Sequence, residues 1–472
     1  MIGYSRGSEW RRWDLHVHSP ASALNNQFEG STPEEKWAKY LQTLRGLTGI
    51  SALGITDYFS IEGYLRTKRD GALTNIDFLI PNVELRILPV TGSKSPINLH
   101  VLFDPGIVEE LDSKFFSSLE FRYDNQTYKC TRSDLIRLGK KYQNDQTLLD
   151  DVAYRHGIEQ FKTSVDRVWE ILNRDKRLKE KSIVALSNSS RDGASGVQHS
   201  SLAATREEIY RISQMIFSGN PNDREYFLGK GIDSNSEVIR KYGGLKPCVH
   251  GSDAHKNSEV CRPCAKRGLA GHDCIAKAEE CEFRFTWIKA DPTFEGLRQI
   301  LFEPEYRVHI GPKPPYEPLY KIGTVSFAFP ETTKLEDDDF CLSGKSEISF
   351  SPNLTCLIGG RGTGKSTILN LIAEKLRPGS AVFFQKNKLK ITDGKSINDC
   401  VRIDEDCEEK YVEFLSQNEI EEFALDNRKF TEAIYQRLIK LDSEKGIARR
   451  QTELEEEFRK IEQHISDIMT QR

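Results

Sequence analysis

The chain has 472 residues, more than one ordinary hydrophobic core accommodates, so we expect two or three domains. Its 67 lysines and arginines are balanced by 71 aspartates and glutamates, which excludes a polycationic protein that binds nucleic acid over its whole surface. No apolar run has the length of a signal peptide or a membrane span, so we expect a cytoplasmic protein without a membrane segment.

Residues 1–310 alternate short apolar runs with polar stretches of helical character. The runs ALGIT, FLIPNVEL, INLHVLF and SIVALS, at residues 52–56, 78–85, 97–103 and 182–187, predict strands. The stretches at 134–142 and 164–181 are typical of helices. This alternation predicts an α/β layer or a β/α barrel.

Side chains of the metal-ligand type recur along these strands. His16 and His18 flank Val17, so both imidazoles lie on one face of a strand. At or near the ends of later strands come the other five members of the set: Asp57, Glu84, His100, Asp253 and His255. Because α/β folds gather their active sites at strand ends, the set predicts a centre for several divalent metals such as Mn, Zn or Fe.

The motifs that carry these ligands resemble a known family. DLHVHSPAS, GITDY, NVELRI, NLHVLFDP and HGSDAH are similar, in content and order, to the motifs of the polymerase and histidinol phosphatase (PHP) domain. The resemblance covers roughly residues 10–310. It implies a distorted β/α barrel that holds two or three metals and hydrolyses phosphoesters.

The same resemblance assigns the ligands by position. It implies one metal bound by His16, His18, Glu84 and Asp253. Glu84 would bridge to a second metal that His100 also touches, and His255 would face a third position. Tyr58 and Asn188 stand where the family usually has histidines, so we expect two metals, with Asp57 as a compensating ligand.

Three further residues are candidates to bind the scissile phosphate: Asn188, Arg191 and His250. The alternative for each is a polar residue at a strand end that bonds to the backbone. Two cations about 4 Å apart lower the pKa of a bridging water and stabilise both oxygens of an in-line displacement. The expected reaction is therefore phosphoester hydrolysis.

A cysteine cluster follows the last of these ligands. Cys261 and Cys264 form a C-x-x-C pair, and His272, Cys274 and Cys281 come after it. A tight pair with later ligands returned by a short loop is a structural zinc pattern. We expect a zinc ion bound by Cys261, Cys264, Cys274 and either Cys281 or His272, which would stiffen the loop; free thiols are the alternative.

Residues 311–318, GPKPPYEP, are dense in proline and predict a linker. In the next domain, residues 319–430, EISFSPNLTCLIGG predicts strands and KSTILNLIAEKL predicts a helix. Between them lies GGRGTGKST, which satisfies the phosphate-loop pattern G-x-x-x-x-G-K-S/T. The residues expected to bind ATP with Mg²⁺ are Gly359, Gly360, Gly362, Gly364, Lys365, Ser366 and Thr367.

Residues 350–373 resemble the N-terminal half of ABC-type ATPase heads of the chromosome-maintenance (SMC) kind. The resemblance adds Gln417 to the nucleotide site and places a coiled coil after the head. It puts the Walker B and signature motifs beyond that coil, so the chain looks like the N-terminal part of a longer protein or one half of a split one. It also implies a homodimer or larger assembly through heads and coiled coil.

Residues 431–472 carry apolar side chains that step largely by threes, fours and sevens amid charge. This spacing is typical of the start of a coiled coil. A single amphipathic helix that lies on its own domain is the alternative.

A PHP-type domain followed by such a head resembles the TrlF-like family of bacterial proteins. That resemblance implies a metal-dependent DNA nuclease, regulated by ATP binding, that acts in antiphage defence. Two alternatives remain open. One is an ATP-regulated phosphatase of nucleotides or small phosphoesters, and the other is an ATP-dependent DNA clamp whose PHP domain is structural.

Overall fold

The computed structural model divides into two compact units, one of which is Ser8–Tyr316 while the other contains Glu317–Arg472. The division falls inside the proline-rich stretch at 311–318. The structure describes residues 6, 9–197, 199–267, 272, 274, 276–334, 344–377, 383–384, 389–391, 393–405, 412, 414–415, 417–441 and 446–470.

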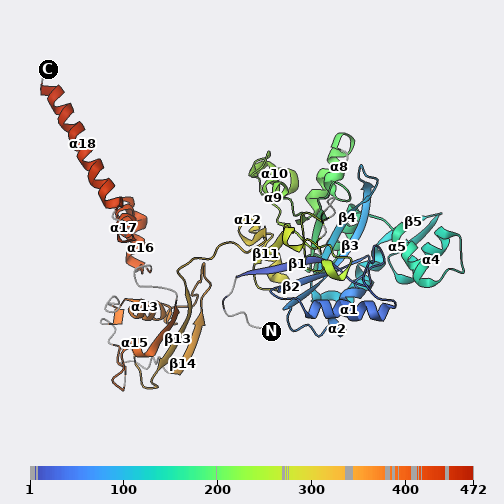
Figure 1. Cartoon of the computed structure of the whole chain (residues 1–472), viewed down its shortest axis with the longest axis horizontal. Helices are drawn as coiled ribbons and strands as arrows, with labels where there is room; N and C mark the ends of the chain where they lie inside the picture. Colours follow the sequence, from blue (N-terminus) through green and yellow to red (C-terminus); the bar gives the residue numbers. More distant parts are fainter. Residues whose placement is uncertain are drawn as a thin grey trace. The chain divides into compact units, whose positions relative to one another are not determined.

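The first unit is built on one sheet of ten strands (Figure 1). The strand order is β10-β9-β8-β4-β3-β2-β1-β11-β12, and β7 pairs with β3. Strands β10 and β12, at the two ends of this order, contact each other, so the sheet is nearly closed and barrel-like. The strands are β1 (Trp10–His18), β2 (Ala52–Tyr58), β3 (Phe78–Val90), β4 (Pro96–Phe103), β7 (Thr163–Ser164), β8 (Ser182–Ser187), β9 (Met215–Phe217), β10 (Cys248–Val249), β11 (Phe285–Lys289) and β12 (Val308–Gly311).

The four strands predicted from apolar runs are confirmed as β2, β3, β4 and β8. Every residue of β2 is buried, which explains its uninterrupted apolar character, since a strand covered on both faces does not alternate. The mixed α/β class is thereby confirmed. The helix predicted at 164–181 is in fact two helices, because Asp175 is extended and its carboxylate accepts the N–H groups of Arg177 and Leu178, which starts a new helix.

Helices cover the sheet on two sides. Helices α1 and α2 lie along one side and α8, α9 and α10 on the other (Figure 1). In α1, Thr32 caps the N-terminus and the buried Trp37, Tyr40, Leu41 and Leu44 recur at helical spacing, which gives one apolar face. The helices of this unit are α1 (Pro33–Arg45), α2 (Glu62–Asp70), α3 (Leu111–Lys114), α4 (Arg132–Gln143), α5 (Asp150–Gln160), α6 (Val165–Arg174), α7 (Lys176–Glu180), α8 (His199–Ile212), α9 (Pro221–Phe227), α10 (Asn235–Tyr242), α11 (Phe294–Gln299) and α12 (Pro304–Arg307).

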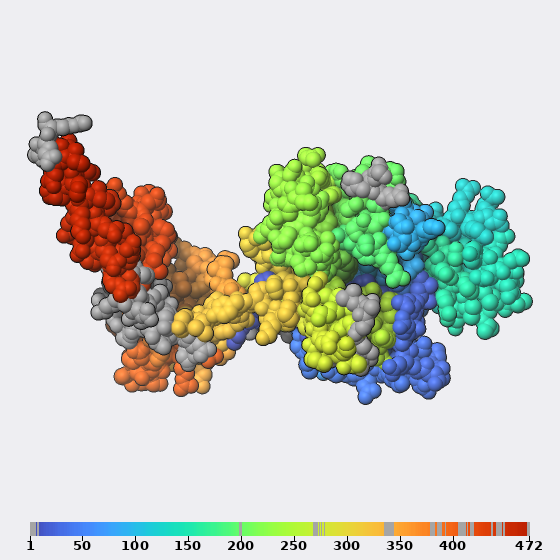
Figure 2. All heavy atoms as spheres, turned by 45° about the horizontal axis from the view of Figure 1, so that its top comes forward, coloured from blue at the N-terminus to red at the C-terminus, as the bar shows by residue number. Residues whose placement is uncertain are grey.

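A small lobe extends from this unit. It contains the hairpin of β5 (Glu120–Tyr123) and β6 (Gln126–Lys129) and the helix pair α4 and α5, and Figure 2 shows it in cyan and teal as a separate bulge. The helix predicted at 134–142 is α4.

The second unit contains a three-stranded sheet in the order β14-β13-β15, with helix α13 (Lys365–Leu376) packed beside β15. The strands are β13 (Ile322–Phe329), β14 (Gly344–Ser349) and β15 (Val401–Glu405), and a short helix α15 (Ile397–Cys400) leads into β15. The predicted helix is confirmed as α13. Of the strands predicted within residues 347–360, only the first is present, as the end of β14 at Ser349; no strand of the described residues includes 354–358, and Leu354 and Ile358 are exposed.

Three helices follow: α16 (Gln417–Leu425), α17 (Asn427–Leu441) and α18 (Gly446–Thr470). The apolar side chains of α18 are exposed at Leu454, Phe458, Ile461, Ile465 and Ile468. The segment predicted to begin a coiled coil is therefore helical in this part. Its pairing with another helix stays a prediction. No helix among the described residues is apolar over the length that a bilayer crossing needs.

Candidate metal centre

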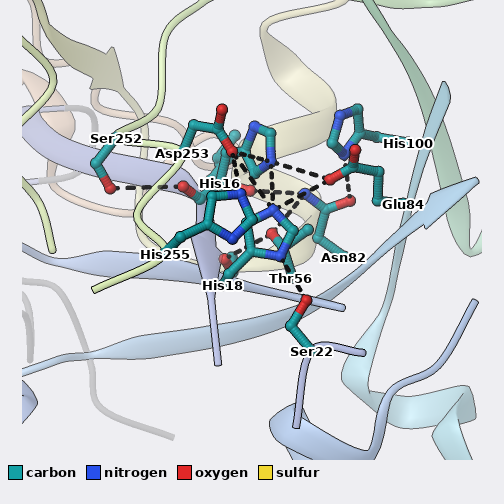
Figure 3. Close-up of polar contacts among 12 residues, drawn as sticks. His16, His18, Ser22, Thr56, Asn82, Glu84, His100, Ser252, Asp253 and His255 are labelled. Carbon is teal, nitrogen blue, oxygen red and sulfur yellow. Dashed lines mark hydrogen bonds and ion pairs between the residues drawn. The ribbon is translucent and has the colours of Figure 1, made fainter. Parts of the chain in front are cut away.

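Three strands and one loop bring the predicted ligands together. His16 and His18 lie on β1, Glu84 on β3 and His100 on β4, while Asp253 follows β10 (Figure 3). Glu84 and His100 are direct cross-strand partners in the β3–β4 ladder. His16, Glu84 and His100 form one group able to hold an ion, and His16, His18 and Asp253 form a second that shares His16.

The Nε2 atoms of His16 and His18 are 3.2 Å apart, and each faces both carboxylates. His16 Nε2 is 3.3 Å from Glu84 Oε2 and 3.2 Å from Asp253 Oδ1. His18 Nε2 is 3.2 Å from Glu84 Oε2 and 3.4 Å from Asp253 Oδ1. A proton can bridge only one pair of these four atoms, whereas one divalent cation can accept electron pairs from all of them.

The pKa values of the ligands indicate that the two carboxylates are stabilised by positive charge between them. Burial opposes protonation of His18, but its hydrogen bonds to Asp253 and Glu84 outweigh burial and raise its pKa to about 9. Although burial favours the neutral acid, contact with the two histidines holds the pKa of Glu84 well below its usual range, and that of Asp253 likewise. Because metal binding replaces protons on such ligands, the group fits a divalent cation.

Two buried atoms next to this group support the presence of a second metal position. Among the described residues, His100 Nε2 and Glu84 Oε1 are buried without a hydrogen-bond partner. Burial and the neighbouring His16 lower the pKa of His100 to about 3, so its imidazole is neutral and can donate an electron pair. Buried polar atoms are rarely left unpaired, so these two atoms fit a second cation beside the first.

The supporting residues orient the ligands. Asn82 Oδ1 accepts from His100 Nδ1 at 3.2 Å, and Ser22 Oγ lies 3.0 Å from His18 Nδ1, so each ring turns its Nε2 inward. Neither residue was predicted. The signal for Asn82 was present, since it lies two residues before Glu84 and so shares its strand face. Ser22 carries no such signal, because only the turn after β1 brings it back to His18.

The loop after β10 holds Asp253 in an unusual conformation. Its φ of 46° lies in the left-handed region, which costs a non-glycine residue on the order of 1 kcal/mol. Backbone hydrogen bonds from Asp253 N to His16 O, 2.8 Å, and from His18 N to Ala254 O, 3.2 Å, hold it there. Asp253 is 60% exposed while Glu84 is 1% exposed, so the centre opens to solvent on the Asp253 side.

His255 and Asp57, the other two predicted ligands, lie outside the two ion-holding groups. His255 Nε2 is 3.4 Å from Asp253 Oδ1, and its ring stacks on His18 at 4.0 Å, so it lies at the edge of the centre. Asp57 belongs to neither ion-holding group. Its two oxygens accept hydrogen bonds from Ser19 Oγ at 2.8 Å and Gly63 N at 2.9 Å, and burial raises its pKa to about 7.

The three candidates for phosphate binding are not gathered into one group. The Asn188 amide donates to Asp223 Oδ2 at 2.7 Å and accepts from the Tyr210 hydroxyl, so both of its polar side-chain atoms already have partners. Arg191 is exposed. His250 is largely buried, and burial with the nearby Arg284 lowers its pKa to about 4.

The cysteine cluster forms a second group, but its members differ from those predicted. Cys264, Cys274 and Cys281 surround His272, with sulfur to Nε2 distances of 3.5, 3.5 and 3.6 Å. Cys261 lies outside this group: it is buried in the hydrophobic core beside α1, where burial raises the pKa of its thiol well above the usual value. The C-x-x-C pair is therefore corrected to a three-cysteine, one-histidine set.

The phosphate loop has the backbone that its sequence predicts. Gly362 and Gly364 have φ values of 80° and 85°, which favour glycine, and α13 begins at Lys365 directly after them. Lys365 Nζ donates to the carbonyl oxygens of Gly359 and Gly360, both at 2.7 Å, so the ammonium lies over the glycine-rich loop. Gln417 is the first residue of α16, and its side chain lies outside the described residues.

No known protein-family model matches the chain, and no curated protein matches it. The case for a function therefore depends on the geometry of these three sites.

The position of Asn82 leads to a testable expectation. Replacing Asn82 with alanine removes the acceptor that orients His100, so we expect Mn²⁺ to bind about tenfold more weakly, the usual effect of losing a partner of a metal ligand. Isothermal titration of Mn²⁺ measures this. Asn75→Ala is the control, because Asn75 bonds to the carbonyls of Leu44 and Leu47 and not to a ligand. Equal Mn²⁺ affinity in both variants would contradict the role of Asn82.

Proposed function

We propose that this protein is a metal-dependent phosphodiesterase, a DNA nuclease whose activity is regulated by ATP binding, and that it serves in bacterial defence against phage. The observation that carries the proposal is the pair of adjoining ligand groups that share His16. Two adjacent divalent cations in such a site would activate water and neutralise charge on a phosphoester.

The residues of the chain have separable roles in this proposal. His16, His18 and Asp253 would hold one cation together with one oxygen of Glu84, and the other Glu84 oxygen with His100 would hold the second. Asn82 and Ser22 orient the histidine rings. Phe217, whose ring lies 4.7 Å from His100 and 5.4 Å from His16, gives the centre an apolar wall that limits water to the open side.

A cleft next to the centre favours a polymeric substrate over a small phosphoester. The cleft has a volume of about 840 Å³ and reaches Ser22, the partner of His18. Two aromatic residues, Trp37 and Tyr154, line it, each with an arginine guanidinium 4.7 Å from the ring centre. Its cationic residues are Lys36, Arg66, Arg132 and Arg155, of which Arg132 is already paired with Asp151 at 2.7 Å; Glu62 and Glu159 are its other acidic residues. The cationic side chains suit the phosphate backbone of a single strand of nucleic acid.

Other basic residues near the barrel give less support. Lys241 forms an ion pair of 2.6 Å with Asp233, and Lys246 is buried with its ammonium on the Ser213 carbonyl. Neither is free to bind a phosphate.

The deciding experiment is incubation of the purified protein with Mn²⁺ and labelled single- and double-stranded DNA, with and without ATP. Mononucleotides and p-nitrophenyl phosphate serve as small substrates in parallel. Metal-dependent cleavage of DNA that exceeds hydrolysis of the small esters would support the nuclease. Release of phosphate from the small substrates alone would support the phosphatase, and no hydrolysis of either would support the DNA clamp.

ATP regulation has its own prediction. Lys365→Ala removes the ammonium over the phosphate loop, so we expect ATP to bind at least about 100-fold more weakly, the loss of roughly 3 kcal/mol that a charged hydrogen bond contributes. Fluorescent ATP binding measures it. Lys375→Ala, at the other end of α13, is the control and keeps its affinity. Unchanged ATP affinity in Lys365→Ala would contradict the assignment of the loop.

A further inference from the structure

The three-cysteine, one-histidine group has the dimensions of a zinc site. In a tetrahedral zinc site the Zn–S and Zn–N bonds are about 2.3 and 2.1 Å, so a sulfur and a nitrogen ligand lie about 3.6 Å apart. The sulfur atoms of Cys264, Cys274 and Cys281 lie 3.5, 3.5 and 3.6 Å from His272 Nε2. The three sulfur–nitrogen distances thus match those of a zinc site, and all four ligand atoms lie within 4.8 Å of one another.

One of these ligands, Cys264, lies in paired backbone, and Cys281 directly precedes the segment with which it pairs. Cys264 forms an antiparallel bridge with Phe283, and the N–H of Ala265 donates to Glu282 O at 2.9 Å. The N–H of Arg284 returns to Pro263 O at 2.9 Å. The two ends of the segment from Cys261 to Arg284, which we call the knuckle, are therefore paired with each other at residues 263–265 and 282–284.

The knuckle is joined to the metal centre through two arginines. Arg267, three residues after Cys264, donates through Nη1 to the carbonyl of Ser252, the residue before Asp253. Its other nitrogen, Nη2, donates to Arg262 O at 2.6 Å. Arg284 Nη1 donates to Gly219 O at 2.8 Å, and a Cβ on Gly219 would lie 2.8 Å from the His250 ring. Both arginines thus hold loops that border the centre.

The Ser252 position matters because Asp253 adopts a left-handed backbone. Ser252 N donates to both oxygens of the buried Asp14 carboxylate, at 3.0 and 3.1 Å, and its Oγ accepts from Cys261 N at 3.3 Å. The Ser252 peptide is therefore fixed from β1 on one side and from the knuckle on the other. Arg267 is the knuckle side chain that contacts the Ser252 carbonyl, and it lies three residues after the ligand Cys264.

We propose that Cys264, His272, Cys274 and Cys281 bind one zinc ion, and that this ion holds Arg267 on Ser252 and so positions Asp253 as a ligand of the histidine centre. The second clause rests on the proposed metal centre and not on its activity. Zinc at the knuckle thus controls how tightly the histidine centre binds its own cation.

Cobalt substitution tests the first clause. Co²⁺ bound by three thiolates gives an intense near-ultraviolet thiolate-to-metal absorption that a site of histidines and carboxylates cannot give. We expect this absorption, with an intensity that corresponds to one thiolate-bound Co²⁺, and this one equivalent beyond what the histidine centre binds, in the parent protein and in Cys356→Ser, which changes an exposed cysteine of the second unit. We expect both to be lost in Cys274→Ser. A parent without the absorption, or a Cys274→Ser variant that retains it, would overturn the zinc site.

Arg267 tests the second clause without disturbing the ligands. Arg267→Ala is expected to keep the knuckle metal but to bind Mn²⁺ at the histidine centre about tenfold more weakly, the low end of what loss of a supporting contact costs. Arg298→Ala, on the surface of α11, is the control and keeps the parent affinity. Unchanged Mn²⁺ affinity in Arg267→Ala would overturn the coupling. A parent that binds Mn²⁺ yet cleaves no phosphoester would contradict only the proposed function.

Discussion

Replacing His16 and His18 together with alanine is expected to abolish metal-dependent hydrolysis and to lower Mn²⁺ affinity by more than about 100-fold. Removing a residue that only supports a ligand lowers metal affinity roughly 10- to 100-fold. This variant loses two direct ligands, so its affinity falls further. His16 and His18 supply both nitrogen ligands of the group that Asp253 completes, so that cation keeps only carboxylate ligands. Titration of Mn²⁺ and cleavage of labelled DNA measure the two effects.

The matched control is His156→Ala. His156 lies on α5 and contacts Gln143 and Glu159, away from the ligand groups. We expect this variant to bind Mn²⁺ and to cleave DNA like the parent. A double variant of His16 and His18 that retained full Mn²⁺ binding would exclude these residues as ligands, whatever its activity.

Replacing Gly54 with alanine is expected to lower the free energy of unfolding by about 3 kcal/mol, the upper range for overpacking a core. A Cβ on Gly54 would lie 2.2 Å from Leu15 O and 2.6 Å from Leu15 C, which are backbone atoms and cannot turn aside as a side chain does. Leu15 precedes His16, and its carbonyl also accepts from Asn82 at 2.9 Å. The variant therefore also weakens Mn²⁺ binding. Urea unfolding followed by circular dichroism measures the stability.

Gly46→Ala is the control for this change. Gly46 has a φ of −84°, and a Cβ there would meet its nearest atoms at an ordinary 3.6 Å. Such a substitution is expected to leave stability the same or to raise it by up to about 1 kcal/mol, because alanine restricts the unfolded chain. If the two variants unfolded alike, the close approach of β2 to β1 at Gly54 would not limit the fold.

The principal strands of the barrel-like unit could be predicted from sequence because their apolar character is local. β2, β3, β4 and β8 each carry a run of buried residues that no helix pattern fits. The segment 354–358 is equally apolar but forms no strand, since a strand exists only where a neighbour supplies hydrogen bonds. The local sequence pattern therefore predicts which segments can form strands, and a neighbouring strand decides which of them do.

Some features of the candidate sites could likewise be predicted from the sequence, and others could not. The sequence by itself determined that His16 and His18 face one side of a strand, and that Gly364 and Lys365 join a glycine-rich turn to a helix, because these are relations between near neighbours. Only the tertiary structure decided that His272 replaces Cys261 in the cysteine group, that Asp57 bonds to Ser19 and Gly63, and that Asn82 orients His100. Those choices depend on distances of a few ångströms between segments far apart in the chain, which the packing of strands and loops sets and residue spacing does not.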